Sequence, residues 1–104
     1  MSVIVINCGQ CGNQIGFELL NSLWDHPGPG DIRGCLDLFY RKSSKSDKTY
    51  ARAVCLDMEP KVINTCVQHA LRDNKWLYDP KSVAYRHGGA GLVLKVLLCI
   101  TFNN

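Results

Sequence analysis

The sequence predicts an α/β fold built on a parallel β-sheet. Short runs of branched apolar residues alternate along the chain with segments whose apolar residues follow a helical spacing. Glycine-rich turns, or turns that contain proline and acidic residues, separate these runs. Alternation of strands and helices is typical of a parallel sheet with right-handed crossovers. The expected elements are a strand at 3–7, a helix at 11–24, a long polar loop at 25–49, a strand at 51–57, a helix at 60–72 and a short strand at 82–86.

The first strand and helix flank the most informative segment. Val-Ile-Val-Ile at residues 3–6 predicts a buried strand. After it, residues 9–16 read Gly-Gln-Cys-Gly-Asn-Gln-Ile-Gly, and three glycines there permit a sharp turn close to a ligand. The helix that follows places on one face the apolar residues Ile15, Leu19, Leu20, Leu23 and Trp24.

A helix N-terminus directly after a strand and a glycine turn is a natural anion site, because its free N–H groups and positive dipole end point outward. The segment ends in no Gly-Lys-Ser/Thr and does not have the Gly-x-Gly-x-x-Gly spacing, so it is neither of these two standard phosphate loops. Spacing alone therefore leaves phosphate binding and a plain strand-to-helix turn both open.

Cysteines offer a second interpretation of the same segment. Cys8 and Cys11 form a Cys-x-x-Cys pair at a helix start, where the dipole lowers a thiol pKa, so redox chemistry is an alternative. No signal peptide is seen, and four of the six cysteines lie in apolar or helical runs, where cysteine acts as a small hydrophobe. These four are Cys8, Cys55, Cys66 and Cys99. A reducing, intracellular protein without a zinc site is expected.

Length and charge limit the remaining classes. A chain of 104 residues forms one domain at most, and its net charge of +3 is mild. Lys42, Lys45 and Lys48 lie in a serine-rich segment, which we expect to be a solvated loop rather than a nucleic-acid patch. The apolar run at 92–100 contains Lys95 and is too short to span a bilayer. Neither nucleic acid nor a membrane is an expected partner.

Three segments resemble the tubulin superfamily. Residues 9–16 are similar to the family's first nucleotide-binding loop, and Ala-Arg-Ala-Val-Cys-Leu-Asp-Met-Glu-Pro at 51–60 is similar to its second strand and the next loop. Residues 78–91 resemble the third strand and its glycine loop, whereas Leu92, Val93 and Leu94 replace the expected Asn-Asn-Trp. Met-Glu-Pro-Lys-Val-Ile-Asn at 58–64 resembles most the delta branch of the family.

The resemblance implies an incomplete Rossmann-like, tubulin-type GTP-binding domain at residues 1–91, followed by a divergent apolar tail at 92–104. We expect a truncated product of a longer tubulin gene. The family's main phosphate loop, Gly-Gly-Gly-Thr-Gly-Ser-Gly, does not occur in the 104 residues. Weak nucleotide affinity and negligible GTPase activity are therefore expected of this polypeptide, and whether it is an enzyme stays open.

The implied ligands are GTP and Mg²⁺. Two carboxylates close to a helix start either cap that helix or, beside a triphosphate, suit Mg²⁺, which keeps several waters. By resemblance, Gln10 and Cys11 contact the nucleotide, Asn13 and Gln14 support the loop, and Glu59 acts on the metal through water. Helix capping and packing are the alternative for Asn13 and Gln14. The full set of implied nucleotide-binding residues is Gly9, Gln10, Cys11, Gly12, Gln14, Asp57, Glu59, Gly89, Ala90 and Gly91.

The resemblance also implies other tubulins as partners and a place in the cytoplasm and cytoskeleton, at microtubules, centrioles, basal bodies and cilia. Two interpretations from other classes remain open. One is a small dithiol oxidoreductase that uses Cys8 and Cys11. The other is an interaction fragment that binds no ligand and contacts partners through residues 92–104.

Overall fold

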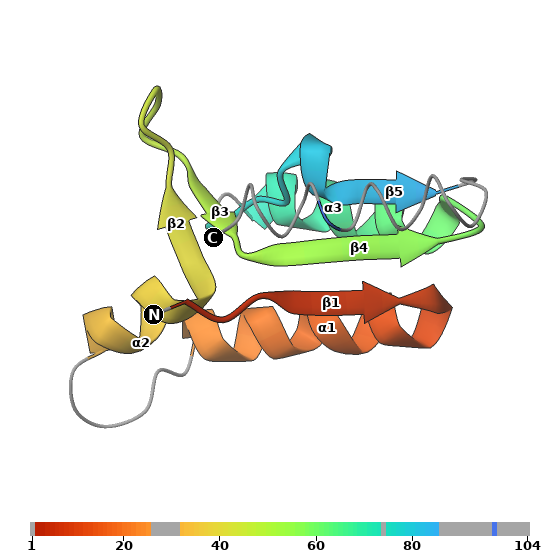
Figure 1. Ribbon diagram of the computed structural model, residues 1–104, viewed down its shortest axis with the longest axis horizontal. Helices are drawn as coiled ribbons and strands as arrows, with labels where there is room; N and C mark the ends of the chain where they lie inside the picture. The colour runs from red at the N-terminus through yellow and green to blue at the C-terminus, as the bar shows by residue number, and fades with distance from the viewer. Residues whose placement is uncertain (1, 26–31, 74, 86–96, 98–104) are drawn as a thin grey trace.

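A computed structural model describes residues 2–25, 32–73, 75–85 and 97, with the side chains of 32–35 and 85 left aside. The described chain forms a three-stranded sheet, a two-stranded sheet and three α-helices (Figure 1). The elements in order are β1 (Val5–Cys8), α1 (Gly9–Asp25), α2 (Ile32–Phe39), β2 (Tyr40–Lys42), β3 (Thr49–Ala51), β4 (Ala53–Asp57), α3 (Lys61–Asp73), the 3₁₀ turn η1 (Pro80–Ser82) and β5 (Val83–Tyr85).

The main sheet is parallel, as the alternation of strands and helices predicts. Its strand order is β1-β4-β5, with Val5 opposite Ala53 and Cys55 opposite Val83. All three strands point the same way, so their carboxyl ends meet at one edge of the sheet (Figure 1). Ligands bind beyond this edge in open α/β sheets.

Residues of β4 alternate between two apolar clusters, one on each face of the sheet. Ala53 and Cys55 belong to the larger cluster, which α1 and α3 cover. Val54 and Leu56 belong to a smaller cluster on the opposite face. The larger cluster is built on buried residues from both helices and on two buried aromatics that follow α3; these are Phe17, Leu20, Ile63, Cys66, Ala70, Trp76 and Tyr78.

The predicted loop at 25–49 is wrong at residues 32–42, whereas 43–48 form no helix or strand and 26–31 lie outside the described residues. Residues 32–42 form α2 and β2, and β2 pairs with β3 as an antiparallel hairpin. Tyr40 explains the order, because its ring is buried, its hydroxyl donates to the Leu20 carbonyl, and Trp24 meets it edge-on with ring centroids 5.1 Å apart. The predicted strand at 51–57 is also interrupted, since Arg52 bends between β3 and β4 and donates its N–H to Phe39 at 2.7 Å.

The predicted apolar face of the first helix is only partly correct. Ile15 and Leu19 are 62% and 43% exposed, although Leu20 is fully buried. The stripe that faces the sheet consists of Asn13, Gly16, Phe17 and Leu20. The N-terminal part of this stripe consists of small and polar residues. The first turns of α1 lie so close to β1 that large apolar side chains do not fit between them.

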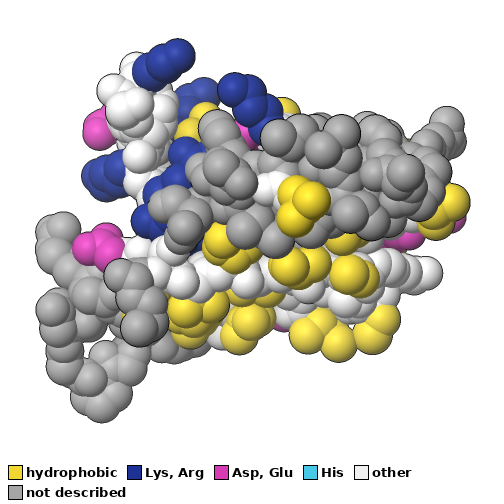
Figure 2. Space-filling view, viewed as in Figure 1, with side chains coloured by type: hydrophobic (Ala, Val, Ile, Leu, Met, Phe, Trp, Pro, Cys, Tyr) yellow, Lys and Arg dark blue, Asp and Glu magenta, His cyan; other side chains and the backbone are white. Residues whose placement is uncertain are grey.

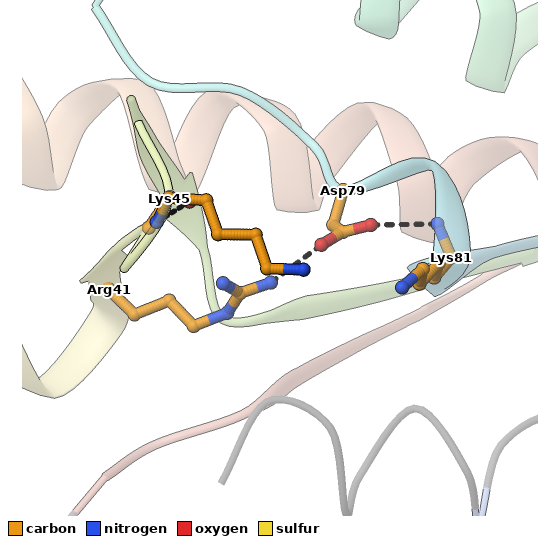
Figure 3. Close-up of polar contacts among 5 residues, drawn as sticks. Arg41, Lys45, Asp79 and Lys81 are labelled. Carbon is orange, nitrogen blue, oxygen red and sulfur yellow. Dashed lines mark hydrogen bonds and ion pairs between the residues drawn. The ribbon is translucent and has the colours of Figure 1, made fainter. Parts of the chain in front are cut away.

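An ion pair fixes the hairpin to the segment that precedes β5. The Arg41 guanidinium lies 2.7 Å from the Asp79 carboxylate, with side chains 18% and 11% exposed, and Figure 3 shows the two groups facing each other. Asp79 also accepts the Lys81 N–H at 2.9 Å, which caps η1. Arg41 lies over the Tyr50 ring at 5.1 Å.

Basic side chains gather over the hairpin (Figure 2). Lys42, Lys45 and Lys48 are all exposed, as predicted, although Lys42 belongs to a strand rather than a loop. Within the described part of the chain, no helix combines the length and the apolar character that crossing a membrane requires.

Candidate functional site

A pocket of about 410 Å³ lies beyond the carboxyl ends of β1 and β4. Its wall comes from three segments: the first turns of α1, the loop after β4 and the first turns of α3. The lining residues are Gln10, Gln14, Asp57, Glu59, Lys61, Val62, Thr65 and Cys66. Amides, carboxylates and an ammonium group therefore converge on one open space of ligand size.

The α1 wall depends on an abrupt change from strand to helix. β1 ends at Cys8 and α1 begins at Gly9, two residues before the predicted start. Gly9 has φ +74°, a left-handed conformation that costs an L side chain about 1–2 kcal/mol. Because the glycine absorbs the turn, Gln10 lies in the first helical turn, whose backbone N–H groups have no partner within the helix.

Asn13 joins the two halves of the pocket. Its side chain is 1% exposed, and its Nδ2 donates to the Gly9 carbonyl at 2.7 Å and the Leu56 carbonyl at 3.0 Å. Gly9 directly precedes Gln10, and Leu56 directly precedes Asp57. One buried amide thus fixes the spacing of the two segments that carry the polar lining.

Gly16 serves packing rather than ligand access. A Cβ at this position would lie 2.0 Å from Oδ1 of Asn7, whose side chain is buried beneath α1. Asn7 in turn directs Nδ2 toward the Cys55 sulfur at 3.8 Å. The last glycine of the 9–16 segment is needed because a polar side chain from β1 occupies the space above it.

The acidic wall is organised by a local turn. Oδ1 of Asp57 accepts the Glu59 N–H at 3.2 Å, and the Pro60 carbonyl accepts the Asn64 N–H at 2.8 Å, at the start of α3. Asp57 is half-buried and Glu59 is exposed. No group of three or more His, Cys, Asp or Glu side chains gathers among the described residues. Two carboxylates suit Mg²⁺ only if phosphate oxygens and water complete its shell.

The structure brings together four of the predicted site residues, namely Gln10, Gln14, Asp57 and Glu59. Gly9, Cys11 and Gly12 lie in the same first turn of α1 but are not among the residues that line the pocket. Gly89, Ala90 and Gly91 lie outside the described residues. Lys61 and Thr65 were missed, although their place at the start of the helix after Pro60 puts them at the same sheet edge.

Thiol exposure divides the described cysteines. Cys55 and Cys66 are buried, as predicted, and burial followed by the nearby Glu18 carboxylate raises the pKa of the Cys66 thiol. Cys8 was expected to be a buried small hydrophobe but is exposed, because it ends β1 at the sheet edge. Cys11 is exposed in the next turn, so the dithiol alternative stays open.

Comparison with known proteins gives consistent matches. The model for the Tubulin/FtsZ family, GTPase domain, matches residues 2–93. The tubulin delta chain of Canis lupus familiaris is 38% identical over 101 residues, and that of Mus musculus is 34% identical over 102 residues. The tubulin delta chain of Homo sapiens is also 34% identical over 102 residues. These alignments cover 88% of this chain and 22% of each relative, so the chain spans about a fifth of their length.

Proposed function

Because the chain belongs to the Tubulin/FtsZ family through its GTPase domain, we propose that it binds a guanine nucleotide in the pocket between α1 and α3. The observation that carries this proposal is the convergence of Gln10 and Gln14 with Asp57 and Glu59 on one pocket. These pairs come from distant segments and meet only because β1 and β4 are parallel neighbours.

In this proposal the first turn of α1 binds phosphate. The positive end of the helix dipole and the free N–H groups of Cys11 and Gly12 favour an anion. Gln10 donates its side-chain amide to a phosphate oxygen or to a metal-bound water. Neither role requires the Cys11 thiol, which accords with its place outside the pocket lining. Gly89, Ala90 and Gly91 are proposed to add backbone donors.

Asp57 and Glu59 are proposed to hold Mg²⁺, with Glu59 acting through water. Bound there, the cation would offset the charge that the phosphates and the two carboxylates share. The donor set fits this role, because hard carboxylate oxygens suit Mg²⁺ and the pocket leaves room for waters. The turn between the Asp57 carboxylate and the Glu59 N–H keeps both side chains at the pocket mouth.

The wider role follows from the relatives rather than from the pocket. Since the matched relatives are tubulin delta chains, we propose a cytoskeletal protein that acts with other tubulins in microtubule-based structures, including centrioles and cilia. Co-sedimentation of the purified chain with assembled microtubules tests this role. Binding that saturates supports it, and equal recovery with and without microtubules contradicts it.

Nucleotide titration tests the proposed pocket. We expect GTP with Mg²⁺ to bind saturably to the wild-type chain. Gln10→Ala should weaken the affinity about five- to tenfold, because it removes one hydrogen bond. Gln68→Ala is the matched control, because Gln68 is an exposed glutamine of α3 that does not line the pocket. If GTP fails to bind the wild-type chain, or if both variants bind alike, the proposal is wrong.

Dithiol oxidoreductase activity is the second candidate, because Cys8 and Cys11 are both exposed at the start of α1. An oxidoreductase requires a strongly acidic thiol at this position. Thiol titration and an insulin-reduction assay, with Cys8→Ser as the control, test it. An acidic thiol and insulin reduction that depends on Cys8 would favour this function over nucleotide binding.

A further inference from the structure

Lys61, at the start of α3, lines the pocket but is not among the site residues that the sequence predicted. We infer that Lys61 makes the pocket selective for a nucleoside triphosphate over a diphosphate, by placing an ammonium group on the terminal phosphate. This inference rests on the proposed nucleotide function. It adds a specificity-determining residue to that site.

The charges of the pocket favour such a group. Asp57 and Glu59 both line it, and among the described residues that line it Lys61 is the single basic side chain. A triphosphate that enters therefore meets two carboxylates of its own sign, and repulsion between unit charges a few ångströms apart is substantial in a partly desolvated site. A lysine next to the carboxylates offsets this repulsion without excluding Mg²⁺.

Lys61 is available for this task. Its side chain is exposed, and within the described residues it forms no ion pair. The first turn of α3 carries no acidic residue, and the acidic residues that line the pocket with Lys61 are Asp57 and Glu59. Its backbone is well fixed, because the Lys61 carbonyl accepts the Thr65 hydroxyl at 3.0 Å and Val62 packs against the core. A flexible charged side chain thus extends from a rigid base.

Position along the chain indicates which phosphate it reaches. Lys61 follows Glu59 by two residues, on the same loop-to-helix junction that is proposed to hold Mg²⁺. Because Glu59 and Lys61 line one pocket, we place the terminal phosphate between the proposed metal site and the Lys61 ammonium group. Lysine binds phosphate as a point charge, so its contribution grows with the charge of the terminal group.

The test compares GTP and GDP affinities of the full 104-residue chain at one ionic strength. We expect Lys61→Gln to weaken GTP binding about tenfold and GDP binding less than about threefold. The larger loss for GTP corresponds to one charge-assisted contact with the terminal phosphate. Lys61→Arg keeps the positive charge and should keep most of the wild-type preference for GTP over GDP. Lys48→Gln removes the same charge from the exposed tip of the hairpin and should leave both affinities unchanged.

The outcomes separate this inference from the function on which it rests. If the wild-type chain binds neither nucleotide, the proposed function fails. If it binds both and Lys61→Gln keeps the wild-type ratio of GTP to GDP affinity, the Lys61 inference fails while the pocket stands. Equal weakening by Lys61→Gln and Lys48→Gln would also overturn it, because the effect would then come from net charge. Matching urea midpoints show that the variants are folded.

Discussion

Nδ2 of Asn13 donates to the carbonyl of Leu56 across 3.0 Å and so joins helix α1 to the end of strand β4. The same nitrogen donates to Gly9, where α1 begins. This one buried amide holds two of the three segments that form the pocket wall, because Gly9 directly precedes Gln10 and Leu56 directly precedes Asp57. The stability of the fold and the geometry of the candidate site are therefore coupled at Asn13.

Replacing Asn13 by aspartate should lower the stability of the fold and disturb the geometry of the candidate site. A carboxylate of the same shape offers no donor to the two carbonyls, and a buried polar group that loses its partner costs about 1–3 kcal/mol. Urea unfolding measures this loss, and Asn64→Asp on the exposed face of α3 is the control. Equal midpoints for the two variants would contradict the proposed coupling.

Gly16→Ala should destabilise the chain by about 1–3 kcal/mol, since the added methyl group meets the buried Asn7 side chain in a well-packed site. Gly12→Ala is the matched control, because its Cβ would meet only the Asn7 carbonyl carbon at 3.7 Å, an ordinary contact. A double variant with Asn7→Ala and Gly16→Ala should recover part of the loss. Additive effects in thermal unfolding would show that the two residues do not compete for space.

Asp79 has two separable roles. Asp79→Asn removes the charge that pairs with Arg41 but keeps an oxygen for the Lys81 N–H, whereas Asp79→Ala removes both. We expect both variants to lose about 1–3 kcal/mol of stability with the ion pair. Asp79→Ala should lose about 1 kcal/mol more, because it also removes the cap. Identical unfolding midpoints for the two variants would contradict a role for the cap.

Stability should fall in alkaline solution. Burial, followed by Glu18, raises the pKa of the Cys66 thiol, and burial, followed by nearby Cys55, raises the pKa of the Tyr78 hydroxyl. At pH 7 both groups are protonated whether or not the chain is folded. Above their ordinary pKa values, about 8.5 for cysteine and about 10 for tyrosine, the unfolded chain loses protons that the folded chain retains.

Unfolding free energies measured from about pH 7 to about pH 10.5 test this dependence. The control is a variant with Cys66→Ala and Tyr78→Phe, which should show a shallower alkaline decline than the wild type. A decline of equal slope in both would mean that other groups cause it.

Sequence patterns identify the elements that hold the site. The branched apolar run before Gly9 and the apolar run in β4 predict two neighbouring strands, which end at Cys8 and Asp57, within one residue of the expected ends. The first strand is not buried as predicted, because Val3 and Ile6 are exposed. Because parallel strands end at one edge, the loops that follow them predict that Gln10 and Asp57 share a crevice. The structure confirms that proximity.

Other features depend on tertiary contacts that no local pattern contains. The β2–β3 hairpin has two three-residue strands with lysine, arginine and threonine, and it is ordered by the buried Tyr40 ring and the Arg41–Asp79 pair. Asn7 sits in an apolar run, and its burial depends on a glycine in the next helix.

The most direct measurement is a two-dimensional ¹⁵N–¹H NMR titration of the 104-residue chain with GTP and Mg²⁺, with ATP as the competitor. Saturable shifts at the amides of residues 9–14 and 57–65, larger with GTP than with ATP, are the predicted result, even if the affinity is weak. Absence of saturable shifts at these amides, or shifts confined to the basic hairpin at 40–51, would contradict a guanine-nucleotide pocket between α1 and α3.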